Sequence, residues 1–158
     1  MLNSAQEKRS DWTPLAFLIG DWVGGGTGEP GQGTGQFSFH YDLQKRILVR
    51  TSYAEYPATD GRAAFRHDDL ILVYKESEKA PVRAIYFDNE GHVINYSVLV
   101  QEDGDRIQFI SDLIPAIPRY RFTYVKAGMN ALKLKFEIAA PGKPDSFSTY
   151  IEASARRD

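Results

Sequence analysis

Histidine is the residue type in this chain best suited to acid–base or metal chemistry, and the sequence contains three: His40, His67 and His92. A neutral imidazole binds zinc or haem iron, and it exchanges a proton near neutral pH. Each histidine lies in or beside a different expected strand, and no two are close in sequence. Because the short ligand spacing typical of a metal site is missing, we predict no metal site.

Of the three histidines, His67 has the more specific hypothesis of acid–base chemistry, because it lies in the charged run Arg66-His67-Asp68-Asp69. Residues two apart in a strand share a face, so His67 and Asp69 could form an acid–base pair. We favour the alternative, a surface charge cluster at the start of a strand. His92 follows Gly91 in a turn, and we expect it to be solvated. An isomerase or hydrolase that uses His67 or His92 with a tyrosine or aspartate partner stays open.

Arginine and tyrosine side chains supply the remaining candidates. Arg119 and Arg121 share one strand face, and two inward-facing arginines could clamp a carboxylate or a phosphate. We favour the outer, solvated face for both. Tyrosine combines an apolar ring with a hydroxyl, which suits a pocket wall. We assign no catalytic residue, because no nucleophile elbow is recognisable. The candidate ligand-binding residues are Trp22, His40, Tyr53, His67, Tyr86, Tyr96, Arg121 and Tyr150.

Strands must position these residues, because almost every segment after Gly20 alternates apolar and polar residues with period two. In residues 36–43 the odd positions are apolar and the even positions are polar. Turn signals such as Asp60-Gly61 separate about ten such segments. After a first strand that begins near Gly20, the expected strands are 36–43, 46–56, 70–74, 82–87, 92–101, 106–113, 119–125, 132–138 and 146–156.

The short turns between these segments favour antiparallel pairing of neighbours in an up-and-down meander. An open sheet of about ten strands would expose long edges, and closure into a barrel removes them. We therefore predict an all-β fold, a closed antiparallel up-and-down β-barrel with room for one small ligand. The pattern does not decide which face of residues 82–87 is interior, since both faces carry aromatic residues.

The segment that enters this barrel has a distinctive composition of glycine and tryptophan. Thr13-Pro14 predicts a short helix with Thr13 as its N-cap, which runs to about Leu18. Gly20, Trp22, Gly24 and Gly26 follow. We expect Trp22 to fill the barrel floor and the glycines to let the strand bend where a side chain would clash. The segment lacks the following Lys-Ser/Thr of a phosphate-binding loop.

Length and composition limit the classes of function and partner that the chain can have. A chain of 158 residues is expected to form one domain, here residues 13–158 after a polar lead-in of residues 1–12. The formal net charge of −2 argues against nucleic acid or an anionic membrane as a partner. The chain has no cysteine, which excludes disulfides and thiolate metal sites. Together with the polar N-terminus, this favours a cytoplasmic location.

The stretch Phe17–Gly26, followed by Glu29-Pro30, resembles the opening motif G-x-W-x-G-x-G of the nitrobindin-like barrels, which are similar in shape to lipocalins and fatty-acid-binding proteins. The segments 62–70, 84–92 and 118–124 are more similar to an uncharacterised bacterial family of the same barrel type. The resemblance implies structural roles for Gly20, Trp22, Gly24 and Gly26. Nitrobindins hold ferric haem through a histidine near the C-terminal strand. Residues 148–156 contain no histidine, so we predict neither haem nor another cofactor.

The function we favour from the sequence is binding of a small, largely apolar molecule inside the barrel. An isomerase or hydrolase built on His67 or His92 is one alternative. A packed barrel without a cavity, which serves as an interaction or dimerisation module, is another. A homodimer is compatible with each of these functions.

Overall fold

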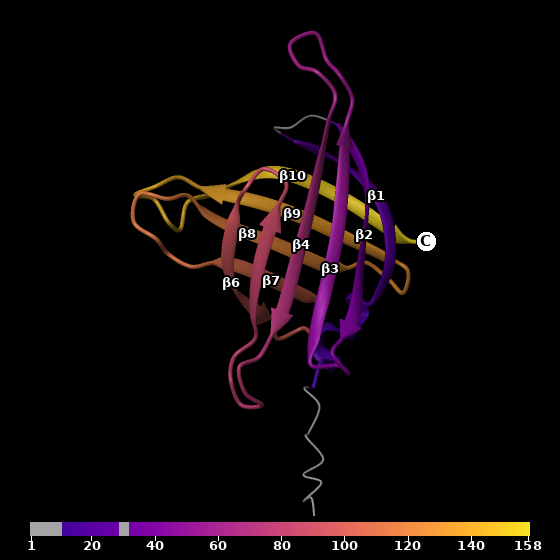
Figure 1. Ribbon diagram of the computed structural model, residues 1–158, viewed down its shortest axis with the longest axis vertical. Coiled ribbons are helices and arrows are strands. Elements are labelled where there is room, and N and C mark those ends of the chain that lie inside the picture. The colour runs from indigo at the N-terminus through magenta and orange to yellow at the C-terminus, as the bar shows by residue number, and fades with distance from the viewer. Residues whose placement is uncertain (1–10, 29–31) are drawn as a thin grey trace, which may run out of the picture.

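The computed structural model describes residues 11–28 and 32–158, which form a closed barrel of ten antiparallel strands preceded by one short 3-10 helix (Figure 1). This architecture confirms the predicted fold class. The elements are η1 (Thr13–Leu18), β1 (Gly20–Gly28), β2 (Gly33–Asp42), β3 (Ile47–Tyr56), β4 (Phe65–Tyr74), β5 (Arg83–Asp88), β6 (Val93–Val100), β7 (Arg106–Ser111), β8 (Arg119–Lys126), β9 (Ala131–Ala139) and β10 (Phe147–Arg157).

Every strand pairs with its neighbours in the chain, and β1 closes the barrel by pairing with β10 as well as β2. In this closure Trp22 lies opposite Arg157, and Gly28 lies opposite Ile151. Because successive strands are antiparallel, their connections alternate between the two ends of the barrel. The connections 57–64 and 89–92 therefore lie at the end opposite η1, which we call the mouth.

Helix η1 covers the other end, the floor (Figure 1). The Trp12 indole nitrogen donates to the Lys45 carbonyl in the β2–β3 turn at 2.9 Å. Trp22 is buried at this end, and its indole nitrogen donates to the Leu18 carbonyl at 2.8 Å. Since Leu15 and Leu18 are also buried, the helix seals the floor with apolar side chains.

The predicted N-cap of η1 is wrong by one residue. Trp12 occupies the N-cap position, and Thr13 is already helical. The Trp12 carbonyl accepts from the Leu15 N–H at 2.9 Å, and the Thr13 N–H donates to the Asp11 carboxylate at 3.0 Å, so the helix begins one residue earlier than predicted. Of the lead-in predicted at residues 1–12, residues 1–10 lie outside the described residues.

Closure of the barrel requires small residues on β1. A Cβ atom at Gly24 would collide with the Ser154 carbonyl oxygen of β10. At Gly26 it would lie only 2.5 Å from the Glu152 carbonyl oxygen. The two backbones approach too closely for a side chain between them, which agrees with the expectation for glycine inside a strand.

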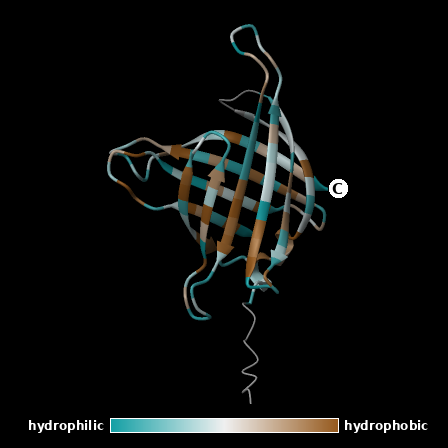
Figure 2. Ribbon diagram, in the orientation of Figure 1, coloured by the Kyte–Doolittle hydropathy of each residue, from teal (hydrophilic) through white to brown (hydrophobic). Residues whose placement is uncertain are grey.

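The alternation along each strand separates an inner face from an outer face, and Figure 2 shows the resulting alternation of apolar and polar residues. On β5 the buried Ala84 and the cavity-lining Tyr86 face inward, whereas Phe87 is 39% exposed on the outside. β4 begins at Phe65, five residues before the predicted start at Leu70, so the charged run 66–69 lies within the strand. No helix in the described ranges is long and apolar enough to cross a membrane.

Candidate functional site

The barrel encloses a cavity of about 900 Å³ in the half that is remote from η1. It reaches the mouth at Arg62 and Phe65 on one side and at Glu90 and His92 on another. A volume of about 300–1,000 Å³ is typical of a pocket that buries a drug-sized molecule. The cavity is therefore large enough for one small ligand.

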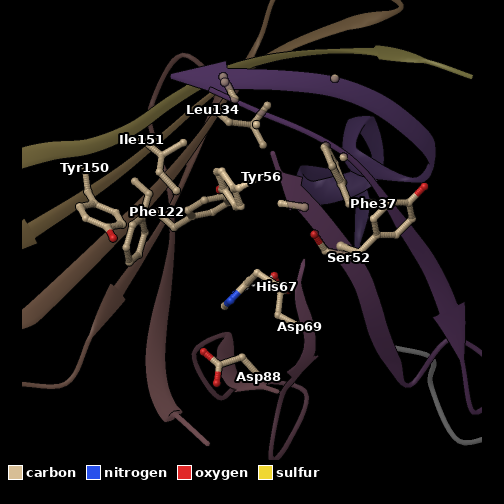
Figure 3. Close-up of a pocket in the computed structure, with 18 of the residues that line it drawn as sticks. Phe37, Ser52, Tyr56, His67, Asp69, Asp88, Phe122, Leu134, Tyr150 and Ile151 are labelled. Carbon is tan, nitrogen blue, oxygen red and sulfur yellow. Dashed lines mark ion pairs between the residues drawn. The ribbon is translucent and has the colours of Figure 1, made fainter. Parts of the chain in front are cut away.

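The wall of this cavity has two chemically different sides (Figure 3). Strands β8, β9 and β10 contribute apolar side chains, among them Phe122, Leu134 and Ile151. Strands β3, β4 and β5 contribute polar side chains that face them. The polar side consists of Arg50, Ser52, His67, Asp69, Tyr86 and Asp88.

Arg50 and Asp69 form a buried ion pair on the polar side, with side chains that are 7% and 8% exposed. The Arg50 guanidinium also donates to the Ser52 hydroxyl at 3.1 Å, and it lies 5.3 Å from the ring centre of Phe37. Burial raises the pKa of the Asp69 carboxyl, and the opposing charge of Arg50 does not cancel this effect. Although burial disfavours the charged guanidinium, Asp69 raises the pKa of Arg50, so the arginine is cationic.

His67 lies above this ion pair, on the same inner face of β4, with its side chain 24% exposed. Its Nδ1 is 2.9 Å from Oε1 of Glu90, which belongs to the turn after β5. Its Nε2 is 2.8 Å from the Tyr86 hydroxyl and 3.7 Å from Oδ2 of Asp69. His67 thus links residues from the mouth and from the interior of the barrel.

Asp88 continues the polar chain toward the mouth. The Tyr86 hydroxyl is 3.0 Å from its Oδ2, and Nδ1 of His92 is 2.8 Å from the same oxygen. The backbone N–H of His92 donates to Oδ1 at 2.9 Å. Burial opposes ionisation of Asp88, but the hydrogen bonds from His92 and Tyr86 outweigh it and hold the pKa of Asp88 below its usual value.

Four of the eight candidate residues direct their side chains toward the cavity: His67, Tyr86, Tyr96 and Tyr150. Tyr86 and Tyr96 meet edge to face, with ring centres 6.5 Å apart. Burial raises the pKa of both hydroxyls, so both are protonated. The structure thus brings one histidine and three tyrosines to the wall of one cavity.

The other four candidates lie elsewhere. Trp22 is part of the floor, and His40 is exposed on the outside of β2. Tyr53 borders the cavity, but its ring faces outward beneath Arg66, whose guanidinium is 3.9 Å from the ring centre.

Arg121 lies on the outer face that we favoured for it, where Nε is 2.7 Å from Oε2 of Glu137. Glu137 holds the pKa of Arg121 above its ordinary value, because the carboxylate favours the charged guanidinium. Since both partners are on the outside of the barrel, an arginine clamp inside it is ruled out for this residue.

Our favoured interpretation of the charged run as a surface cluster is corrected by the structure. Arg66 and Asp68 do pair on the outer surface, at 3.0 Å. His67 and Asp69 instead face the cavity, because β4 extends back to Phe65 and its alternation directs every second side chain inward. His92 is 55% exposed, as expected, but it also contacts Asp88.

Arg50, Ser52, Asp88 and Glu90 are site residues that sequence reasoning missed. The sequence could have indicated Arg50 and Ser52, because each lies an even number of residues from Leu48 and Tyr56 on the same strand and so shares their buried face. No comparable signal existed for Glu90. Its side chain reaches His67 only through the pairing of β4 with β5.

The fold and the site together define a closed ten-stranded antiparallel barrel with a ligand-sized cavity. The chain is similar in structure to Rv2717c from M. tuberculosis, with a TM-score of 0.61, 17% identity, and coverage of 92% of this chain and 96% of that one. It is also similar to the S-type phycobiliprotein lyase CPES from Guillardia theta, with a TM-score of 0.55, 10% identity, and coverage of 100% and 98%. At these identities the likeness shows the fold alone. No protein-family model and no curated protein sequence matches the chain.

Iron or another metal would need ligands on the cavity wall. Within residues 11–28 and 32–158, no group of three or more histidines, aspartates or glutamates is arranged to hold a metal ion. The cavity-lining side chains of β10 include the apolar Ile151 and Ala153 and the hydroxyl-bearing Tyr150. Strand β10 therefore offers no histidine as an iron ligand.

Proposed function

We propose that this protein binds one small molecule inside the barrel, with an apolar body and a polar end. The observation that carries the proposal is the cavity of about 900 Å³ with its divided wall. The apolar body would contact Phe122, Leu134 and Ile151, and the polar end would face His67 and Tyr86. The sequence alone favoured a largely apolar ligand, and the polar chain on β4 and β5 adds the second requirement.

The cavity also bears on the alternative of a packed interaction module. Such a module would fill its interior with side chains, as a small closed barrel can do. Because an open volume lies between Phe122 and His67, we do not retain this alternative. A dimer of ligand-binding barrels stays compatible with the proposal.

The proposal includes the remaining sequence-based expectations. We propose a distant relation to the nitrobindin-like barrels, which the opening motif around Trp22 supports, and function without haem. We also propose a cytoplasmic location, which the absence of cysteine supports. Nucleic acid is not a proposed partner, in view of the net charge of −2.

The test is binding of the neutral fluorescent probe N-phenyl-1-naphthylamine to the wild type and to two double variants. Leu134 and Ala153 are cross-strand partners whose side chains line the cavity. In Leu134→Trp/Ala153→Phe we expect affinity to fall by at least about tenfold, because two large side chains occupy the space of the probe. Lys135 and Glu152 are the neighbouring cross-strand pair on the outer face, and neither lines the cavity, so Lys135→Trp/Glu152→Phe is the matched control.

The control should bind the probe as tightly as the wild type does. Equal affinity in all three proteins, or no binding to the wild type, would contradict the proposal. Native mass spectrometry of the freshly purified protein, followed by denaturation and extraction, then identifies the class of any molecule that co-purifies. Circular dichroism verifies that both double variants keep the β-sheet spectrum.

A further inference from the structure

Glu90, His67 and Tyr86 form a carboxylate–imidazole–hydroxyl series on the cavity wall. The distances are 2.9 Å from Glu90 Oε1 to His67 Nδ1 and 2.8 Å from His67 Nε2 to the Tyr86 oxygen. This is the arrangement in which a carboxylate orients a histidine whose second nitrogen faces a hydroxyl. All three residues line the same cavity, so a ligand there can reach the imidazole and the hydroxyl.

The donors and acceptors of this series determine which atom is free to act. An ionised Glu90 can only accept, so a neutral His67 carries its proton on Nδ1 and keeps the lone pair on Nε2. The Tyr86 hydroxyl has one proton and two neighbouring acceptors, Nε2 of His67 at 2.8 Å and Oδ2 of Asp88 at 3.0 Å. When Tyr86 donates to Asp88, Nε2 of His67 is left without a donor.

We propose that His67, with Tyr86 as a hydrogen-bond donor to the carbonyl oxygen, transfers a proton at the carbon next to the carbonyl group of a cavity ligand. This inference rests on the proposed binding function and names a ligand class for it, apolar ketones or aldehydes with an enolisable C–H bond. A hydroxyl donor beside an imidazole acceptor matches the two needs of enolisation, which are removal of a carbon-bound proton and stabilisation of the oxygen.

The step balances without a further reactant. Nε2 of His67 takes the proton from the carbon, the C–H electron pair becomes the C=C bond of the enolate, and the carbonyl π pair moves to oxygen. Tyr86 turns its O–H from Asp88 to this oxygen and stabilises the negative charge. Glu90 stabilises the imidazolium that forms. Return of the proton to the same or to another carbon completes an exchange or an isomerisation.

The surroundings suit Tyr86 as a hydrogen-bond donor better than as a nucleophile. Burial, together with the charges of Asp69 and Asp88, raises the pKa of Tyr86, so its phenol keeps the proton and serves as a donor. Arg50 adds no free positive charge to the site, because it is paired with Asp69.

The test uses 2-tetralone, an apolar bicyclic ketone, in D₂O. Exchange of its α-protons is followed by ¹H NMR, and its binding is followed in the same samples by saturation-transfer difference. We expect the wild type to accelerate exchange over buffer, and His67→Asn and Tyr86→Phe each to reduce the acceleration on the order of 100-fold. His40→Asn removes an exposed histidine on the outside of β2 and should match the wild type.

The two measurements separate the two proposals. Binding of 2-tetralone with equal exchange rates in wild type and both variants would overturn the acid–base inference and leave ligand binding intact. Absence of 2-tetralone binding would refute apolar enolisable ketones as the ligand class, and the fluorescent-probe experiment then decides the binding proposal alone. Two independent variants are used so that misfolding of one does not decide the result.

Glu90 is a positioning residue in this scheme, since it acts through His67. In Glu90→Gln we expect slower exchange with unchanged binding of 2-tetralone, and in Glu90→Asp partial recovery of the rate, because a carboxylate orients the imidazole and stabilises the imidazolium that forms. Weaker binding of 2-tetralone that accounts for the lower rate in Glu90→Gln, or a rate in Glu90→Asp no higher than in Glu90→Gln, would overturn this role for Glu90.

Discussion

Arg50 and Asp69 bring two opposite charges into the interior of an otherwise largely apolar barrel. Their side chains are only 7% and 8% exposed, and rings of Phe37 and Phe122 lie 5.3 and 5.5 Å from the guanidinium. A buried ion pair contributes little net stability, but loss of one partner leaves an uncompensated charge. This pair therefore holds the polar side of the cavity in place more than it stabilises the fold.

We expect Asp69→Leu to destabilise the protein by about 3–5 kcal/mol, because the Arg50 charge then has no partner. The double variant Arg50→Met/Asp69→Leu should recover most of this loss. Urea unfolding of the wild type, Asp69→Leu, Arg50→Met and the double variant gives the coupling energy between the two residues. Additive effects of the two substitutions would mean that the pair is not coupled.

Asp88 makes stability depend on pH at the acid end. Its folded pKa is lowered by the hydrogen bonds from His92 and Tyr86, so folding favours the carboxylate. The stabilisation is fully present above the unfolded value of about 4 and is lost as pH falls through the lower folded pKa. We expect the stability difference between the wild type and Asp88→Asn to shrink as the pH falls below about 4.

Urea unfolding midpoints across this pH range measure that difference. Asp112→Asn is the matched comparison. Like Asp88, Asp112 has a lowered pKa, but the cause is Arg83 on the outside of the barrel, away from the cavity. A difference between wild type and Asp88→Asn that stays constant with pH would mean that ionisation of Asp88 does not stabilise the fold.

At the scale of elements, the pairing of β1 with β10 is the contact that converts a meander into a barrel. The register places Gly24 opposite Ala155 and Gly26 opposite Ala153, so four small residues occupy the seam. The Cβ position of Gly24 overlaps the Ser154 carbonyl oxygen. The seam therefore closes only because β1 lacks side chains at these positions.

Gly24→Ala should cost about 1–3 kcal/mol, because the added methyl group forces the two strands apart. Gly61→Ala is the control, since a Cβ atom there has no heavy atom within 4 Å, and we expect a change within about 0.5 kcal/mol. Thermal and urea unfolding compare the two variants. A cost at Gly61 equal to that at Gly24 would show that backbone flexibility, and not the seam, is responsible.

At the scale of the whole molecule, the last residues of the chain complete the barrel. Arg157 lies 4.4 Å from the Trp22 ring centre and donates to the carbonyls of Ile19 and Phe17 at 2.6 and 3.3 Å. These contacts join the C-terminus to η1 and β1. The barrel thus depends on contacts between residues 17–22 and Arg157.

Removal of residues 155–158 should abolish cooperative thermal unfolding, because β1 loses the strand partners of Trp22, Val23 and Gly24. Removal of Asp158 alone leaves that register intact and serves as the control. Circular dichroism and size-exclusion chromatography follow both truncations. A cooperative transition in the longer truncation would show that closure at this seam is not required for folding.

Much of this architecture was predictable from local sequence. The period-two alternation of residues such as 119–125 and turn signals such as Asp60-Gly61 predict strands and hairpins, because side-chain direction in a strand depends only on residue parity. The same parity rule identifies Arg50 as an inward residue beside Leu48. The Thr13 N-cap was mispredicted because the first helical hydrogen bond, from the Leu15 N–H, goes to the Trp12 carbonyl, which makes Trp12 the N-cap residue.

The sequence by itself determined the number and type of elements, since alternation and turn chemistry are properties of neighbouring residues. Only the tertiary structure decided that His67, Tyr86 and Glu90 meet. Their contact depends on the register that pairs Asp69 with Asp88 and Ile71 with Tyr86. It also depends on closure of the barrel, which turns one face of each strand into a cavity wall. Register and closure are set by packing between residues distant in the chain, and no local pattern encodes them.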